Sequence, residues 1–339
     1  MDNTLPIYQH PTLTILVDDS QSFLESLAFR LGSRFANKAF CEPQTALGWL
    51  KREHLYSVHL AHDAVLVGYD EKTGSFERRN ASIDVAQIYH VVMNRERFAI
   101  PSVLVIDYEM PQMNGVEFCQ AIRELPCRKI LLTGEADEKI AVDAFNRNLI
   151  DCFINKSDPD ALDKLEAEII KLQRRFFNRQ SQTLKDILSR HSYSFLSDPV
   201  IGELVQELCN LNNFVEYYLF PNPDGILFVD VQGKATLMVI ETRASLKAHL
   251  EIAQDQDAPS ELLDALKKMS VVPFFSKTGG VYLKEIGLSW TSFCLPSKVM
   301  KGKQDYFWAL FDLPANYLHS PLYSYREFLN EQEAELAAI

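Results

Sequence analysis

A short apolar run that ends in an acid constrains the fold of this chain more than any other segment. Residues 103–107 read V-L-V-I-D, and Pro111 and Gly115 follow in the next loop. A continuous run of β-branched and aliphatic residues favours a strand buried on both faces of a parallel sheet, and proline and glycine end it. Ligand sites in open α/β sheets form where such strands end. We therefore expect Asp107 to be exposed for chemistry.

Three other segments repeat this arrangement of an apolar run that closes on a polar residue. They are T-I-L-V-D-D at 14–19, K-I-L-L-T at 129–133 and C-F-I-N-K at 152–156. Right-handed crossovers through the intervening helices would make the four strands parallel neighbours. The sequence therefore predicts that five side chains converge at one edge of a sheet: Asp18, Asp19, Asp107, Thr133 and Lys156.

The predicted cluster holds three carboxylates, which need a counter-ion. Carboxylates about 5 Å apart repel by roughly 3 kcal/mol per pair at an effective dielectric constant of about 20. A small set of oxygen ligands favours Mg²⁺, which keeps waters or takes phosphate oxygens in its remaining positions. Lys156 and Thr133 can hold other phosphoryl oxygens. This arrangement suits attack by the Asp107 carboxylate on a phosphoryl group, which would form an acyl phosphate.

The motifs resemble the receiver domain of bacterial two-component response regulators. The resemblance rests on D-D at 18–19, D-x-x-M-P-x-M-x-G at 107–115, Thr133 and Lys156, and it covers about the first half of the chain. It implies a doubly wound, parallel five-stranded α/β domain in which Asp107 is the phospho-acceptor. It also implies that a sensor histidine kinase or a phosphotransfer protein supplies the phosphoryl group.

The resemblance further assigns metal-binding and switch residues. Asp18, Asp19, Asp107 and the backbone carbonyl of Glu109 would carry Mg²⁺. Thr133 and Lys156 would form the switch pair, and Phe153 would be the aromatic residue that packs inward after phosphorylation, although it is also an ordinary candidate for the core.

Three departures from the family pattern stand out. The interval between Asp19 and Asp107 is about twice the usual one, and residues 53–98 form the predicted insertion, with a hairpin from 64–69 and 75–79 and a helix over 83–97. Ser157 follows Lys156, where the family usually has a proline after a cis peptide bond. Glu109 and Glu135 place acids at positions that face the hydrolytic water in the family, which predicts an altered phosphoryl lifetime.

Composition excludes several classes of protein. The 339 residues carry a net charge of −12, and the six cysteines include no Cys-x-x-Cys pair, so neither a zinc ribbon nor a disulfide framework is indicated. No run approaches the ~20 apolar residues that span a bilayer, and the first residues lack the pattern of a secretion signal. We expect a cytoplasmic protein with no membrane partner. The acidic charge disfavours general attraction to nucleic acid, but a small basic patch on the helix at 160–190 leaves that question open.

The second half of the chain predicts a connecting helix and a separate output domain. Residues 159–193 form the predicted helix, and its apolar spacing allows either a coiled-coil seam for dimerisation or packing on its own domain. The seam would consist of Leu162, Leu165, Ile169, Leu172 and Phe176.

Residues 194–339 predict an α+β output domain with an antiparallel sheet. The expected order is a helix at 198–220, strands at 226–231 and 235–241, helices at 245–253 and 260–268, and strands at 281–286, 291–295 and 305–312. This order resembles that of PAS-type sensor domains. No familiar output motif appears in this half.

Together these features predict a response regulator with a receiver domain at 1–158 and no enzymatic activity beyond its own phosphorylation and dephosphorylation. A long receiver insertion with an acidic, PAS-like output half is similar to the response regulators of bacterial quorum sensing. Phosphorylation would then switch dimerisation. The alternatives are a haloacid-dehalogenase-like phosphatase, which also uses an aspartate nucleophile after a strand, and a transcriptional regulator that binds DNA through its output half.

Overall fold

The computed structural model divides the chain into two compact units. It describes residues 5–32, 34–57, 65–69, 79–134, 138–190, 193–314, 317–318 and 321–337, without the side chains of 53–57, 65–69, 79–82 and 335–337. The parallel-sheet unit consists of residues 10–62, 94–180 and 328–339, and the antiparallel-sheet unit consists of residues 1–9, 63–93 and 181–327. The units therefore interleave along the sequence, whereas the predicted boundaries after residues 158 and 193 divide it in a single pass.

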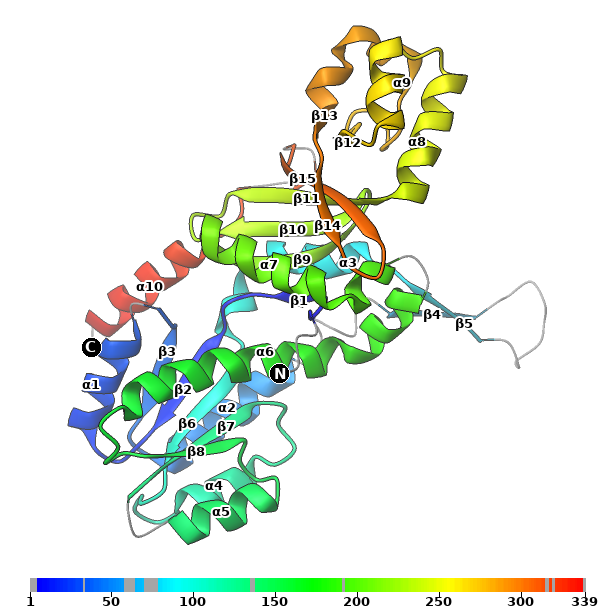
Figure 1. Cartoon of the computed structure of the whole chain (residues 1–339). Coiled ribbons are helices and arrows are strands. Elements are labelled where there is room, and N and C mark those ends of the chain that lie inside the picture. Colours follow the sequence, from blue (N-terminus) through cyan, green and yellow to red (C-terminus); the bar gives the residue numbers. More distant parts are fainter. Residues whose placement is uncertain are drawn as a thin grey trace. The chain divides into compact units, whose positions relative to one another are not determined.

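The parallel-sheet unit is a doubly wound α/β fold, as the sequence predicts (Figure 1). Its described residues form one five-stranded sheet with strand order β3-β2-β6-β7-β8. The strands are β2 (Leu13–Val17), β3 (Asn37–Phe40), β6 (Pro101–Asp107), β7 (Arg128–Thr133) and β8 (Cys152–Asn155), and the helices are α1 (Gln21–Gly32), α2 (Pro43–Ser57), α4 (Gly115–Ala121), α5 (Glu138–Asn146) and the first part of α6 (Ala161–Arg190). The chain runs from β2 to β3 on one side of it, and the next strand of this sheet, β6, lies on the other side of β2. The strand order therefore reverses between β2 and β6, and ligand sites of such sheets form at the carboxyl ends of the two strands at this point.

Helices α1 and α6 pack with the central strands into one hydrophobic core. Leu24 and Leu27 of α1 meet Val103 and Val105 of β6 in this core, and α6 also contributes to it. All seven residues of β6 are buried, as expected for a strand covered on both faces. This core holds β6 in place, and with it the carboxyl end of the strand, where the predicted site lies.

The apolar stripe of α6 packs on its own unit. Leu165, Ile169 and Leu172 are at most 2% exposed and belong to the same core as the sheet residues. Phe176 is 5% exposed. Of the two alternatives for this helix, the structure supports an amphipathic helix covering its own sheet, because four of the five residues of the predicted seam are buried there and only Leu162, at 40%, is exposed.

The predicted hairpin of the insertion is present. Strands β4 (Val65–Tyr69) and β5 (Arg79–Ile83) pair antiparallel, with Val65 opposite Ile83. The second strand thus starts at the end of its predicted range. The predicted helix over 83–97 is broken into α3 (Ala86–His90) and the 3₁₀ turns η1 (Val91–Met93) and η2 (Arg95–Ala99), with Asn94 in an extended conformation capping η2.

The antiparallel-sheet unit confirms the predicted α+β class. Its main sheet has the order β1-β9-β10-β11-β15-β14 within the described residues, and β12 and β13 form a separate pair. The strands are β1 (Tyr8–Gln9), β9 (Phe214–Pro221), β10 (Asp224–Asp230), β11 (Ala235–Thr242), β12 (Val271–Pro273), β13 (Cys294–Pro296), β14 (Lys298–Lys301) and β15 (Asp305–Asp312). The helices are α3, the end of α6, α7 (Pro199–Asn212), α8 (Arg243–Asp255) and α9 (Ser260–Lys267), with 3₁₀ segments η1, η4 (Ser194–Ser197) and η5 (Lys284–Phe293), and α10 (Tyr325–Ala337) begins here. The β4–β5 hairpin also belongs to this unit. The narrower likeness to PAS domains stays a prediction.

Two predictions in this unit were wrong in detail. The helix predicted over 198–220 ends at Asn212, because Asn213 adopts a left-handed conformation (φ 54°) and the aromatic run after it forms β9. The strand predicted at 281–286 is absent: residues 281–283 are irregular, and η5 begins at Lys284 after Leu283, which is extended. No described helix is both long and apolar enough to cross a membrane.

Candidate functional site

Three carboxylates meet at the carboxyl edge of the parallel sheet. Asp18 and Asp19 follow β2, and Asp107 is the last residue of β6. The pairing of Val17 with Ile106 sets these strand ends side by side. One carboxylate oxygen from each acid lies within 4.8 Å of the others. Asp18 and Asp107 are 2% and 7% exposed, whereas Asp19 is exposed, so the cluster opens to solvent on the Asp19 side.

Lys156 bridges two of the acids. Its Nζ lies 2.7 Å from Asp18 Oδ2 and 2.7 Å from Asp107 Oδ1. Its backbone N–H donates to the carbonyl of Thr133 at 2.9 Å, which extends the β7–β8 pairing by one residue. The ammonium group also lies 4.4 Å from the ring centre of Phe23 on α1, a cation–π contact.

The electrostatics of the cluster reflect burial opposed by ion pairing. Burial raises the pKa of Asp107; the hydrogen bond and charge of Lys156 work against this shift, and the charge of Asp18 adds to it. Burial alone would lower the pKa of Lys156, but its hydrogen bonds to Asp107 and Asp18 outweigh burial and raise it. Lys156 therefore stays charged near neutral pH and partly compensates two carboxylates.

A tightly built loop holds Asp107 at the end of its strand. A Cβ atom at Gly115 would lie 2.4 Å from the backbone oxygen of Asp107, so only glycine fits this approach. The Gly115 N–H donates to the carbonyl of Tyr108 at 2.9 Å, and Asn114 caps α4 in a reciprocal capping box with Glu117. This explains in physical terms why the predicted motif ends in glycine.

The predicted switch residues lie at the same edge. The Thr133 hydroxyl is buried at the end of β7 and donates to the Ile154 carbonyl at a long 3.5 Å. Phe153 is half-buried on β8, opposite Leu131 in the strand register. The structure thus places Thr133 and Phe153 on neighbouring strands.

Three residues differ from the family pattern near the site: Glu109, Glu135 and Ser157. Glu109 is exposed in the loop after β6, and Glu135 lies outside the described residues. Ser157 replaces the usual proline, and its N–H donates to Asn155 Oδ1 at 2.9 Å. This Asx turn orders the loop, and Lys156 reaches both acids without a proline beside it.

The acidic cluster fits a hard divalent cation of the kind that receiver domains bind. Its donors are all carboxylate oxygens, and Mg²⁺ prefers oxygen ligands and retains several waters. The single positive charge of Lys156 neutralises only part of the negative charge of Asp18 and Asp107, and the exposed position of Asp19 leaves room for water at the cation.

The sequence analysis did not identify Phe23 or the steric role of Gly115. The contact of Phe23 is non-local and left no local signal, while Gly115 was visible in the motif.

Comparisons with known proteins agree with this geometry. The family model described as response regulator receiver domain matches residues 72–166. The match starts inside the insertion, which separates Asp18 and Asp19 from the rest of the motif. The solved structure of the Legionella pneumophila response regulator LqsR is 30% identical, with a TM-score of 0.78, and the match covers 98% of this chain and 97% of that one.

Several of the shorter matches are receiver domains. A Francisella response regulator receiver domain is 13% identical with a TM-score of 0.31, covering 48% of this chain and 98% of that one. A receiver domain protein from Clostridium thermocellum is 13% identical with a TM-score of 0.30, covering 52% and 98%. A search of curated proteins found no match.

Proposed function

Because this chain belongs to the response regulators and carries their receiver domain, we propose that it accepts a phosphoryl group on Asp107 in a two-component pathway. The donor is a sensor histidine kinase or a phosphotransfer protein. The observation that carries the proposal is the contact of Lys156 Nζ with both Asp18 and Asp107 at 2.7 Å, inside a cluster of three acids.

The chain's own residues account for the transfer step. An Asp107 carboxylate oxygen attacks phosphorus, a new O–P bond forms, and the bond from phosphorus to the donor atom breaks with its electron pair leaving on the donor. Lys156 is placed to neutralise an oxygen of the transferred group, since its ammonium already contacts Asp107 Oδ1. Asp18, Asp19 and the Glu109 carbonyl would hold Mg²⁺, which supplies charge stabilisation for phosphoryl transfer when bound.

The change after transfer is proposed to pass through Thr133, Lys156 and Phe153. A phosphoryl oxygen on Asp107 competes for the Lys156 ammonium and attracts the Thr133 hydroxyl, whose present hydrogen bond is long at 3.5 Å. Movement of Thr133 would free space that the half-buried Phe153 can enter. The two acids at Glu109 and Glu135 are proposed to set the lifetime of the acyl phosphate.

The output proposed for this switch is a change in self-association, in a quorum-sensing pathway. Helix α5 exposes apolar side chains that a second copy could cover: Ile140 and Val142 are each 42% exposed and Phe145 is 47% exposed. Exposed apolar patches of this kind are typical of interaction surfaces. A haloacid-dehalogenase-like phosphatase is not proposed, because the full-length relative is a response regulator.

The experiment incubates the purified chain with acetyl phosphate, with Mg²⁺ or with EDTA, and measures intact mass and oligomer size. A single phosphoryl addition that needs Mg²⁺ and is lost in Asp107→Asn is expected. Asp143→Asn, an exposed acid on α5, is the matched control and should label normally. Absence of labelling with both acetyl phosphate and a phosphorylated histidine donor would contradict the proposal. Salt-sensitive binding of promoter DNA would instead support the DNA-binding alternative.

A further inference from the structure

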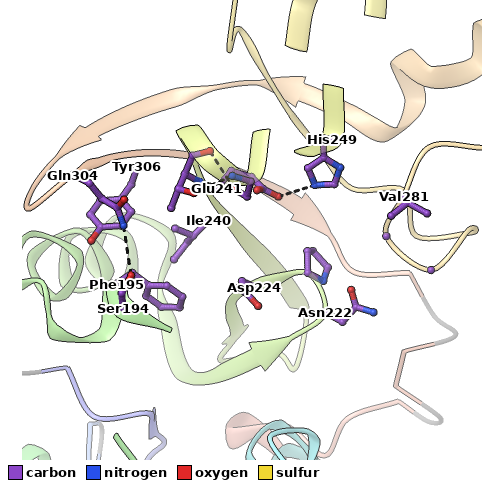
Figure 2. A pocket seen from close by; sticks show the side chains of 15 residues that line it. Ser194, Phe195, Asn222, Asp224, Ile240, Glu241, His249, Val281, Gln304 and Tyr306 are labelled. Carbon is purple, nitrogen blue, oxygen red and sulfur yellow. Dashed lines mark hydrogen bonds and ion pairs between the residues drawn. The ribbon is translucent and has the colours of Figure 1, made fainter. Parts of the chain in front are cut away.

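The antiparallel-sheet unit contains a pocket of about 470 Å³ that the phosphoryl chemistry does not use (Figure 2). It lies where the turn between β9 and β10, the end of β11 and the loop before η5 come together, and its lining includes Asn222, Asp224, Glu241, His249 and Gly280. The volume lies within the range of ordinary small-molecule sites. The pocket lies within residues 194–306, all in this one unit.

Two carboxylates dominate the charge of the pocket. Glu241 is 5% exposed and pairs through Oε1 with His249 Nε2 at 3.3 Å, a contact drawn as a dashed line in Figure 2. Asp224 is half-buried, and no described residue forms a hydrogen bond or ion pair with its carboxylate. No lysine or arginine is among the lining residues. Glu241 thus has His249 as a partner, whereas the Asp224 carboxylate has no basic partner among the described residues.

The protonation behaviour of Asp224 agrees with this imbalance. Burial, together with the nearby charge of Glu241, raises the pKa of Asp224 to about 6. A nearby cation would favour the ionised carboxylate and lower this pKa, and no such cation is among the causes that set it.

The geometry disfavours two other ligand classes. Within the described residues, the one group of three or more metal-ligating side chains with atoms within 4.8 Å is Asp18, Asp19 and Asp107, so the pocket acids do not form a metal cluster. A phosphate-bearing ligand would meet two acids and no lysine or arginine. The remaining lining suits an organic molecule, because Phe195, Ile240 and Tyr306 provide apolar and aromatic walls.

We propose that this pocket binds a small organic cation of the amine or guanidine class, with its charged N–H group held by Asp224 and Glu241. The Gln304 and Asn222 amides offer carbonyl oxygens for further N–H donors. The aromatic rings of Phe195 and Tyr306 suit the methylene groups or the cation itself. The regulator would then sense a soluble amine in addition to phosphorylation.

The test titrates the full chain at neutral pH with agmatine, putrescine and spermidine as probes, with calorimetry as the readout. Neutral 1,4-butanediol and anionic succinate are the matched non-cationic ligands. At least one amine is expected to show saturable binding with a Kd below about 5 mM. Butanediol and succinate should bind at least about tenfold more weakly, since they lack the charge that pairs with the acids.

Substitutions locate the binding site. Asp224→Asn and, separately, Glu241→Gln should each weaken amine binding by at least about tenfold, whereas Asp255→Asn, an exposed acid at the end of α8, should not change it. Circular dichroism of each variant checks that the unit is folded. The proposal is overturned if none of the three amines binds, if butanediol binds equally well, or if folded Asp224→Asn and Glu241→Gln both bind like wild type.

Discussion

Replacing Asp224 with asparagine is expected to make the protein more stable at neutral pH. The side chain keeps its size and loses its charge. In the folded chain burial and Glu241 raise the pKa of this carboxyl to about 6, whereas in the unfolded chain it titrates near its ordinary value of about 3.9. The folded state therefore binds the proton more tightly than the unfolded state, so ionising Asp224 costs stability above pH 6.

The size of the effect follows from that difference. A shift of about two units corresponds to roughly 3 kcal/mol, at about 1.4 kcal/mol per unit. Asp224 lines an open pocket and is half-buried, so solvent screening reduces this to about 1–1.5 kcal/mol. Asp224→Asn should therefore raise the free energy of unfolding by that amount at pH 7.5. The gain should shrink as the pH falls from 6 toward 4, because the wild-type carboxyl becomes protonated in the folded state.

The assay is urea unfolding of both proteins at pH 7.5 and pH 4.5, followed by tryptophan emission. Trp308 on β15 is a reporter in the antiparallel-sheet unit. Asp255→Asn should change the free energy of unfolding by no more than about 0.5 kcal/mol at either pH. A variant that is less stable than wild type at pH 7.5, or a gain that is equal at both pH values, would refute the reasoning.

Four further predictions concern the parallel-sheet unit. Gly115→Ala should destabilise it by about 2 kcal/mol or more, because the new Cβ would lie 2.4 Å from the Asp107 carbonyl oxygen; thermal unfolding measures this, and an unchanged Tm would contradict the geometry. Lys156→Ala should slow labelling by acetyl phosphate at least about tenfold, because it removes the cation that contacts Asp107; an unaltered time course would remove Lys156 from the transfer step. Glu109→Ala should change the decay rate of the acyl phosphate, and identical decay in wild type and variant would show that this exposed acid has no effect on the water. Phe29→Ala, which removes a side chain 88% exposed on α1, should slow transfer from a kinase but leave acetyl phosphate labelling intact; equal losses with both donors would instead indicate damage to the site.

The site was predictable from the sequence because its residues follow local patterns. Each of β2, β6, β7 and β8 is an apolar run that ends in a polar residue, and parallel pairing necessarily brings such ends to one edge. The contact of Phe23 with Lys156 was not predictable, because it joins residues far apart in the sequence whose spacing follows no motif.

The antiparallel-sheet unit was harder to predict, for physical reasons. No glycine or proline separates the helix from the strand between residues 203 and 220, and the break depends on Asn213 adopting a left-handed conformation. The pairing of β1 with β9 brings Tyr8 opposite Tyr218. Strand β1 has only two residues, and neither strand alone indicates which partner it takes. The hairpin of β10 and β11 was predicted because Gly233, with a φ of 84°, and Asp230 build its turn locally.

The interleaving of the two units has a consequence for how the regulator is made. The chain passes between the units after residues 9, 62, 93, 180 and 327. Strand β1 ends at Gln9, and its partner β9 begins about 205 residues later, at Phe214. At a synthesis rate of about 5–20 residues per second, β1 waits roughly 10–40 seconds on the ribosome for its partner. The five strands of the parallel sheet are complete by Asn155, so that sheet can close while β9 is still unmade. The antiparallel-sheet unit closes only after β15 is made, so a translation product interrupted before Asp305 carries the parallel sheet without a finished partner unit.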